Sequence, residues 1–249
     1  MTGLDYTCNV CGARCHSAEK DLARETPSCS TCRSTVRMRE VTYLASVALF
    51  GTGLPIPELP VRPELRGIGL SDWWEYVDQL AHHITYTNSW YHHEPRLDVT
   101  AVPNEHAGKY DFVISTDVFE HVLPPVQLAF DGAAQLLKPG GALVLTVPWR
   151  PDGETLEHYP DAVGYDVLEV DGRYEVDIVD ASGGRRRVTD PVFHGGPGST
   201  LEMRIFSLPG ILQCLATAGF RSVRVLREEV LEFGIHHPTE LSLAVLARK

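Results

Sequence analysis

The sequence predicts an α/β fold in which parallel strands form a sheet that is covered on both faces. Residues 111–115 (DFVIS) and Ala142 to Val147 are short apolar runs, as expected of strands with two buried faces. Between them, Val126 to Leu137 has apolar residues at helical spacing, and Lys138 to Gly141 (KPGG) would end that helix. A strand, a helix and a second strand in this order form a unit of two parallel strands.

Polar side chains follow the first of these strands at the point where it should end. They are Asp117, Glu120 and His121. Doubly wound folds bind ligands beyond the carboxyl ends of their parallel strands. We therefore expect a ligand site at this edge of the sheet.

The stretch from Tyr110 to Trp149 resembles the second half of the core of class I S-adenosylmethionine-dependent methyltransferases. Residues 117–122 (DVFEHV) are similar to the acidic loop after the family's fourth strand, and residues 136–148 (LLKPGGALVLTVP) to the helix, turn and strand that follow. The resemblance implies a Rossmann-like, seven-stranded sheet and S-adenosyl-L-methionine as cofactor. It extends in layout from Leu65 to the C-terminus and is sharp from Leu97 to Pro148.

The resemblance also implies residues that bind the cofactor. Gly67 and Gly69 lie where the family has its glycine-rich turn, but Ser71 and Trp73 stand where further glycines are expected. Ser71 and Asp72 would cap the following helix, contact the cofactor, or do both.

Three more positions correspond to cofactor-binding residues of the family. The acidic residue that holds the ribose at the end of the second strand is missing, and Asn88 is the nearest polar replacement. An amide can donate to and accept from a diol, but without the strength of a carboxylate. Asp98, in a short third strand from Leu97 to Val99, corresponds to the residue facing the adenine amino group. Asp117 corresponds to the cofactor edge of the fourth strand.

Five of the six cysteines lie in the first 32 residues. They include two C-x2-C pairs separated by residues 12–28, a spacing typical of four-thiolate zinc sites. Such a site has no open position, so we expect a structural role for the ion. Cys15 and His16 lie near the first pair and could replace one ligand. The predicted ligands are Cys8, Cys11, Cys29 and Cys32.

The chain divides into three predicted parts. Four prolines and two glycines between residues 51 and 63 favour a linker after a helix from Val36 to Phe50. Ser222 to Leu226 and Glu240 to Ala247 are expected to form an antiparallel pair at the sheet edge. The predicted parts are a zinc ribbon or knuckle (1–35), a helix and proline-rich linker (36–62), and a methyltransferase domain (63–249) with an insertion at about 150–205.

The insertion is predicted to contain a β-hairpin, because Val167 to Val179 alternates apolar and polar residues around Asp171-Gly172. In the family, an insertion here builds the acceptor pocket. Histidine suits proton removal from an acceptor near neutral pH. His158, His194 and His121 are the candidates. The alternatives are that His121 simply caps or lines the cofactor site and that the other two are ordinary loop residues.

The composition limits the classes of partner. A formal net charge of −11 disfavours binding to nucleic acid and favours a small-molecule acceptor. The sequence has no apolar run long enough to cross a bilayer and no signal-peptide pattern at its start, so we expect a cytoplasmic protein without membrane contact. Its oligomeric state is left open.

Three functions are compatible with these features. The first is a methyltransferase acting on a small molecule, with secondary metabolism as the expected setting. The altered glycine turn and the missing ribose acid would also suit an enzyme that transfers another alkyl group of the sulfonium or cyclises it. The third is a non-catalytic binding module whose zinc-binding segment contacts a partner. Product analysis separates the first two, because only methyl transfer yields S-adenosylhomocysteine.

Overall fold

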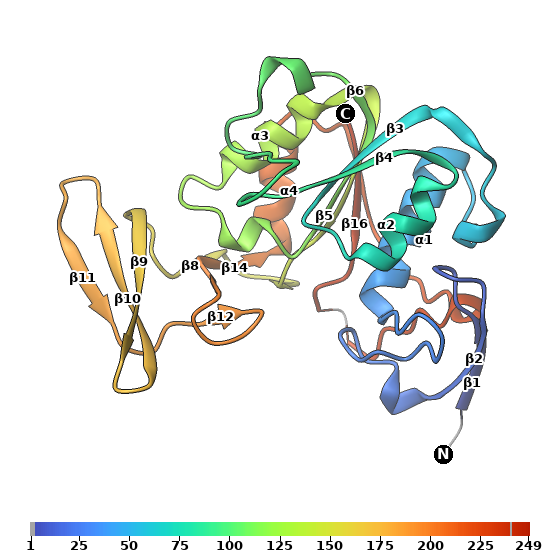
Figure 1. Cartoon of the computed structure of the whole chain (residues 1–249), viewed down its shortest axis with the longest axis horizontal. Coiled ribbons are helices and arrows are strands. Elements are labelled where there is room, and N and C mark those ends of the chain that lie inside the picture. Colours follow the sequence, from blue (N-terminus) through green and yellow to red (C-terminus); the bar gives the residue numbers. More distant parts are fainter. Residues whose placement is uncertain (1–2, 240) are drawn as a thin grey trace.

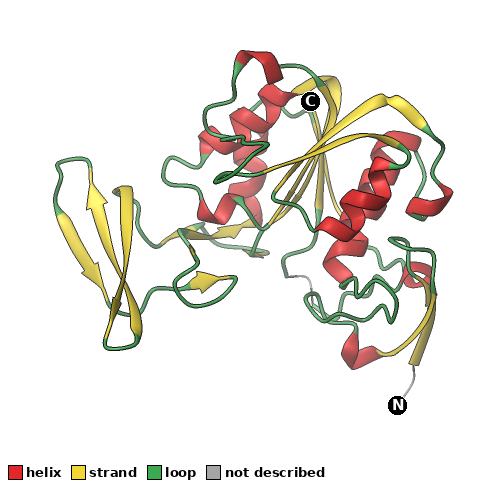
Figure 2. Cartoon of the chain, viewed as in Figure 1, coloured by secondary structure: helices red, strands yellow, loops and turns green. Residues whose placement is uncertain are grey.

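The computed structural model describes residues 3–239 and 241–249. Residues 1 and 2 of the predicted zinc-binding segment and residue 240 of the predicted last strand therefore lie outside the described residues. A mixed sheet forms the centre of the fold, with helices on both of its faces (Figures 1 and 2). Its strands follow the order β15 (Ser222–Val225), β16 (Val245–Arg248), β6 (Leu137–Thr146), β5 (Tyr110–Thr116), β3 (Arg62–Leu70) and β4 (Ile84–Ser89).

The strands from β6 to β4 are parallel to one another, and β16 runs antiparallel to both of its neighbours. This confirms the predicted parallel sheet with an antiparallel pair at its edge. The predicted count of seven strands is not met, because the described residues give this sheet six. The segment from Leu97 to Val99 is a loop, in which the Asp98 carboxylate accepts hydrogen bonds from the backbone and hydroxyl of Thr100 at 2.8 and 2.7 Å. Local bonding of this kind competes with strand pairing.

The two faces of the sheet have separate apolar cores. Helices α1 (Val36–Phe50) and α2 (Trp74–Ala81) cover one face, where Phe112 and Ile114 of β5 are buried. Helices α3 (Gln127–Leu136) and α4 (Leu208–Thr217) cover the other face, where Val113 is buried among them. Alternate residues of one strand thus enter opposite cores, which explains why the strands are continuously apolar.

Helix α1 has the predicted limits because its two ends are capped. The Thr35 hydroxyl accepts a hydrogen bond from the Met38 backbone, and Gly51 has a left-handed conformation with φ +76°. The helix packs on β5 and β6, so this part of the segment 36–62 belongs to the layer that covers the sheet. Among the helices in the described ranges, none is long and apolar enough to cross a membrane.

The insertion forms a small antiparallel sheet that projects from the body (Figure 1). Strands β9 (Ala162–Val170) and β10 (Arg173–Asp180) make the predicted hairpin, and Asp171 and Gly172 both have positive φ, at 50° and 74°. A third strand, β11 (Arg185–Val188), pairs with β10.

Short strands and single turns complete the fold. The strands are β1 (Gly3–Thr7), β2 (Arg14–Ala18), β7 (Trp149–Arg150), β8 (Leu156–Glu157), β12 (Phe193–His194), β13 (Thr200–Leu201) and β14 (Arg204–Ser207). The 3-10 turns are η1 (Glu19–Asp21), η2 (Ile56–Glu58), η3 (Asn104–His106), η4 (Phe119–His121) and η5 (Leu231–Phe233).

Candidate active site

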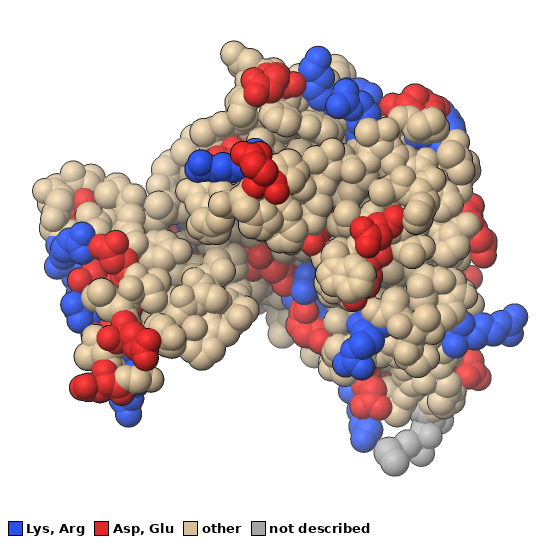
Figure 3. Space-filling view, viewed as in Figure 1, with Lys and Arg blue, Asp and Glu red and all other residues tan. Residues whose placement is uncertain are grey.

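A cleft of about 830 Å³ lies beyond the carboxyl ends of β3 and β5. Parallel strands place their ligand sites at this edge. On the visible surface, acidic and basic side chains are intermixed beside the hollow between the insertion and the N-terminal segment (Figure 3). The cleft is lined by Arg24, Glu25, Arg37, Met38, Ser71, Asp72, Trp73, Trp74, Trp90, Thr116, Asp117, Pro148, Phe193, His194 and Gly195.

The turn after β3 is closely packed at its two predicted glycines. A Cβ on Gly69 would lie 1.9 Å from the Asp72 carboxylate, and one on Gly67 would lie 2.3 Å from the Phe112 ring. Asp72 is buried and accepts a hydrogen bond from the Tyr86 hydroxyl. Burial raises the pKa of Asp72 to about 7. The glycines therefore make room for the protein's own side chains at this edge of the cleft.

The predicted helix cap at Ser71 and Asp72 is wrong. Helix α2 begins at Trp74, and its N-cap residue Trp73 makes no side-chain cap hydrogen bond. The Asp72 side chain is buried and bonds the Tyr86 hydroxyl instead, and the preceding Ser71 has a left-handed backbone with φ 57°. Both residues line the cleft, so a contact with a bound ligand remains their predicted role.

Asn88, at the end of β4, braces this turn. Its amide oxygen accepts from the Asp72 backbone N–H and its amide N–H donates to the Asp72 carbonyl, both at 2.9 Å. Asp98 is not among the residues that line the cleft, and its carboxylate is engaged by Thr100. The turn, Asn88 and Asp117 thus lie together at one edge, while Asp98 lies apart from them.

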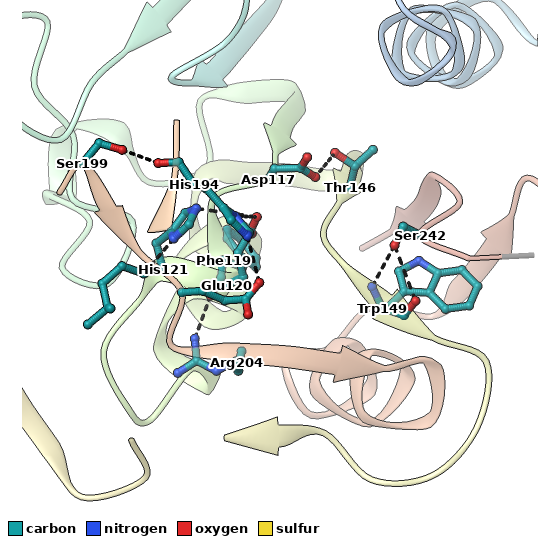
Figure 4. A network of polar contacts seen from close by, with 12 residues as sticks. Asp117, Phe119, Glu120, His121, Thr146, Trp149, His194, Ser199, Arg204 and Ser242 are labelled. Atoms are coloured by element: carbon teal, nitrogen blue, oxygen red, sulfur yellow. Dashed lines mark hydrogen bonds and ion pairs between the residues drawn. The ribbon is translucent and has the colours of Figure 1, made fainter. Parts of the chain in front are cut away.

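Asp117, directly after β5, is held by two arginines from the N-terminal part of the chain. Arg24 donates to both carboxylate oxygens at 2.8 and 3.1 Å, and Arg37 approaches to 3.3 Å. The Thr146 hydroxyl donates to the same carboxylate at 2.9 Å (Figure 4). Burial would raise the pKa of Asp117, but the two guanidinium groups lower it below its usual value.

Sequence reasoning missed both arginines. Arg24 lies between the two cysteine pairs and Arg37 lies in the first turn of α1, far along the chain from Asp117. No local pattern marks a contact across that separation. The one sequence feature that pointed to these arginines was the clustering of basic residues next to the cysteine pairs.

The three predicted histidines meet two glutamates, and we call Glu120, His121, His158, His194 and Glu202 the histidine–glutamate cluster. Glu202 accepts from His194 Nε2 at 2.8 Å and from His158 Nε2 at 3.0 Å. Glu120 lies 3.6 Å from His194 Nδ1 and 3.7 Å from His121 Nε2. Figure 4 shows His121 and His194 converging on Glu120. Glu120 had been expected at the ligand edge without an assigned role, and Glu202 had not been predicted at all.

Strand β14 and the loop before it position this cluster. The Met203 N–H donates to the Glu120 carbonyl at 2.8 Å, and the Met203 carbonyl accepts from the His158 N–H at 2.9 Å. The fully buried Arg204 donates to the Phe119 carbonyl at 2.8 Å and to Glu157 at 2.7 Å. The insertion is thus tied to the loop after β5, which brings its histidines to the cleft.

Burial and charge change the acidity of the cluster. Burial raises the pKa of Glu120 to about 7 and lowers the pKa of His121. The Glu120 carboxylate raises the pKa of His194. Of the three histidines, His194 lines the cleft.

The four predicted zinc ligands converge at the N-terminal end of the molecule. The sulfurs of Cys8, Cys11, Cys29 and Cys32 all lie within 4.8 Å of one another. Two of the sulfur pairs are 3.7 Å apart. A tetrahedral zinc site with Zn–S bonds of about 2.3 Å has sulfurs about 3.8 Å apart, so the geometry fits this ion.

The two alternative ligands differ in position. His16 is exposed and its ring nitrogen bonds the Asp5 carboxylate at 2.7 Å, away from the sulfurs. Cys15 is buried, with its sulfur 3.5 Å from that of Cys29, but it lies outside the group of four. This arrangement supports the four cysteines of the two pairs as the ligand set.

The sequence matches the family described as "Methyltransferase domain" over residues 51–225, which is more than half of the chain. The chain therefore belongs to this family and is a class I S-adenosylmethionine-dependent methyltransferase, as its fold predicts.

Solved structures of methyltransferases are similar to it. The carbon methyltransferase of CurJ has 14% identity and a TM-score of 0.49, with 86% of this chain and 55% of that chain covered. CalS10, an amino pentose methyltransferase from Micromonospora echinaspora, has 14% identity and a TM-score of 0.45, with 86% and 92% covered. The 1,6-didemethyltoxoflavin-N1-methyltransferase of Burkholderia thailandensis has 12% identity and a TM-score of 0.44, with 84% and 78% covered. The chain matches no curated protein sequence.

Proposed function

We propose that this protein transfers the methyl group of S-adenosyl-L-methionine to a small-molecule acceptor that enters from the side of the insertion. The observation that carries the proposal is the composition of the cleft. It brings Asp117, at the end of β5, together with His194 from the insertion. A cofactor edge and a proton acceptor therefore share one cavity. The net charge of −11 supports a small acceptor over nucleic acid.

The residues around the cleft fit a cofactor that carries a nucleoside and a carboxylate. The rings of Trp73, Trp74 and Trp90 line it and can pack against a nucleobase. Arg24 and Arg37 supply guanidinium groups that suit a carboxylate. A volume of about 830 Å³ accommodates a cofactor together with a small acceptor.

Bound S-adenosylmethionine supplies an electrophilic methyl group: the acceptor's lone pair forms the new bond to carbon while the electron pair of the S–C bond stays on sulfur. The protein's residues orient the reactants and exclude water. An acceptor that loses a proton passes it to the histidine–glutamate cluster. His194 and His158 are the proposed proton acceptors, and Glu202 holds both imidazoles.

We further propose that the four-cysteine site holds a structural zinc ion. Four thiolates satisfy its coordination, so the ion stabilises the loops that carry Arg24 and lead into α1. In this way the metal acts on the cleft through the position of the arginines.

Calorimetry with S-adenosylhomocysteine tests the cofactor site. We expect one binding site in the wild type, and Arg37→Gln should weaken that binding by roughly 10-fold to 100-fold, because a charge-assisted hydrogen bond is lost. 5′-Methylthioadenosine lacks the carboxylate, so its affinity should be the same in both proteins. Equal losses for both ligands would contradict the assigned role of Arg37, and no binding of either S-adenosylhomocysteine or S-adenosylmethionine to the wild type would contradict the proposed function.

Turnover of an acceptor found by screening tests the histidines. We expect His158→Ala and His194→Ala each to lower kcat by roughly 100-fold, since proton transfer commonly contributes that much. The affinity for S-adenosylhomocysteine should stay at the wild-type value, because neither residue belongs to the proposed cofactor edge. Full activity in both variants would show that the acceptor's proton leaves by another route.

A further inference from the structure

Three side chains of the histidine–glutamate cluster have the arrangement of a metal site. One ligand atom from each of Glu120, His121 and His194 lies within 4.8 Å of the other two. The first two residues come from η4, next to Asp117, and the third comes from β12 in the insertion. Two segments far apart in the sequence thus supply two imidazoles and one carboxylate to one point.

The Glu120 carboxylate is fully buried, and neither of its oxygens has a hydrogen bond to any residue in the described ranges. Its contacts with the imidazoles of His194 and His121, at 3.6 and 3.7 Å, are too long for hydrogen bonds. A buried carboxylate that accepts no hydrogen bond is costly. A cation between the three groups would give this carboxylate a direct contact.

The outer nitrogen of each imidazole is already engaged, which turns the inner nitrogen toward Glu120. His121 Nδ1 lies 2.8 Å from the Leu201 carbonyl oxygen, which leaves Nε2 facing the carboxylate. His194 Nε2 lies 2.8 Å from Glu202, which leaves Nδ1 facing the carboxylate. Metal-binding histidines characteristically donate their other ring N–H to a carbonyl or carboxylate in this way.

The spacing suits a transition-metal ion. Nitrogen and oxygen ligands lie about 2.0–2.1 Å from Zn²⁺, so they are about 3.3 Å apart in a tetrahedral site. The observed 3.6 and 3.7 Å would need only a small contraction. Two imidazoles and one carboxylate favour zinc, iron or manganese over calcium or magnesium.

We propose that Glu120, His121 and His194 bind one divalent transition-metal cation, for which Zn²⁺ is the test ion, with Glu202 and the Leu201 carbonyl orienting the two imidazoles. Three protein ligands leave a coordination position open, and His194 lines the cleft. If the proposed function holds, an acceptor oxygen can occupy that position, where the cation lowers the pKa of a hydroxyl. With the cation bound, His194 acts as a ligand instead of a proton acceptor, and His158, which bonds Glu202 and stays outside the ligand set, is the histidine left to accept the acceptor's proton.

Metal content provides a test that does not depend on activity. The full chain is incubated with excess ZnSO4, passed through gel filtration and assayed by elemental analysis. We expect two equivalents of zinc in the wild type, one from the cysteines, and one equivalent in His194→Gln and Glu120→Gln. His82→Ala, at an exposed position after α2, serves as the control and should keep both. The retained cysteine-bound ion serves as an internal standard for folding.

Cobalt spectroscopy separates the two sites. Thiolate-bound Co²⁺ gives an intense sulfur-to-metal charge-transfer band, whereas a site with nitrogen and oxygen ligands gives only weak visible bands. We expect His194→Gln to lose weak-band intensity and keep the charge-transfer band. A wild type with one equivalent of zinc, or a second equivalent that His194→Gln and Glu120→Gln both retain, would overturn the proposal. Binding of S-adenosylhomocysteine to Glu120→Gln at wild-type affinity would leave the proposed function intact in either case.

Discussion

Cys29→Ser should leave the protein unable to retain zinc at its four-cysteine site and should weaken S-adenosylhomocysteine binding by at least about 10-fold. A zinc ion bound by the four cysteines would hold together the loops on either side of Arg24, which lines the cleft and binds Asp117. When the fourth thiolate is lost, these loops are no longer cross-linked and the arginine is no longer fixed. Elemental analysis and calorimetry on the same preparation measure both effects.

Cys214→Ser is the matched control, because it makes the same chemical change in α4, away from the sulfur cluster. It should retain the zinc and the wild-type affinity. Zinc retained by Cys29→Ser would contradict the assignment of the ligands. Loss of zinc with unchanged affinity would contradict the link between the metal and the cleft.

Asp117→Asn should lower the free energy of unfolding by about 2 kcal/mol at neutral pH, because it removes one of the two carboxylates, the other being Glu25, that pair with the partly buried Arg24 and Arg37. The pKa of Asp117 is lower in the folded protein than its ordinary value of 3.8. The stabilisation that the Asp117 carboxylate provides is therefore complete above the ordinary pKa. It is lost as the pH falls through the lower pKa of the folded protein. Urea unfolding at a series of pH values should show the difference between variant and wild type shrinking below about pH 4.

Asp177→Asn removes a similar carboxylate, which pairs with Arg185 and Arg187 on the inserted sheet. These arginines are exposed to solvent, so the change should affect stability far less. Equal losses of stability in the two variants would mean that Asp117 contributes no more to stability than a carboxylate paired with exposed arginines does.

Local sequence patterns predicted helices and turns correctly where residues close together in the chain determine the conformation. Helix α1 begins after a threonine cap and ends at a left-handed glycine, both visible in the sequence. The Asp171-Gly172 turn predicted the hairpin of the insertion, because its positive φ values suit these residues. The short strand predicted at Leu97 failed because the Asp98 side chain bonds its neighbours instead.

The sequence by itself determined the family, the parallel sheet and the two cysteine pairs. Each of these depends on residues close together in the chain or on a fixed spacing. Only the tertiary structure decided what surrounds the cleft. It set Arg24 and Arg37 against Asp117, and it placed His194 beside Glu120. These partners lie far apart along the chain, and their contacts arise from the packing of the N-terminal cysteine-containing segment and the insertion on opposite sides of the sheet edge (Figure 1). This packing cannot be predicted from local propensities, because it results from burial summed over the whole domain.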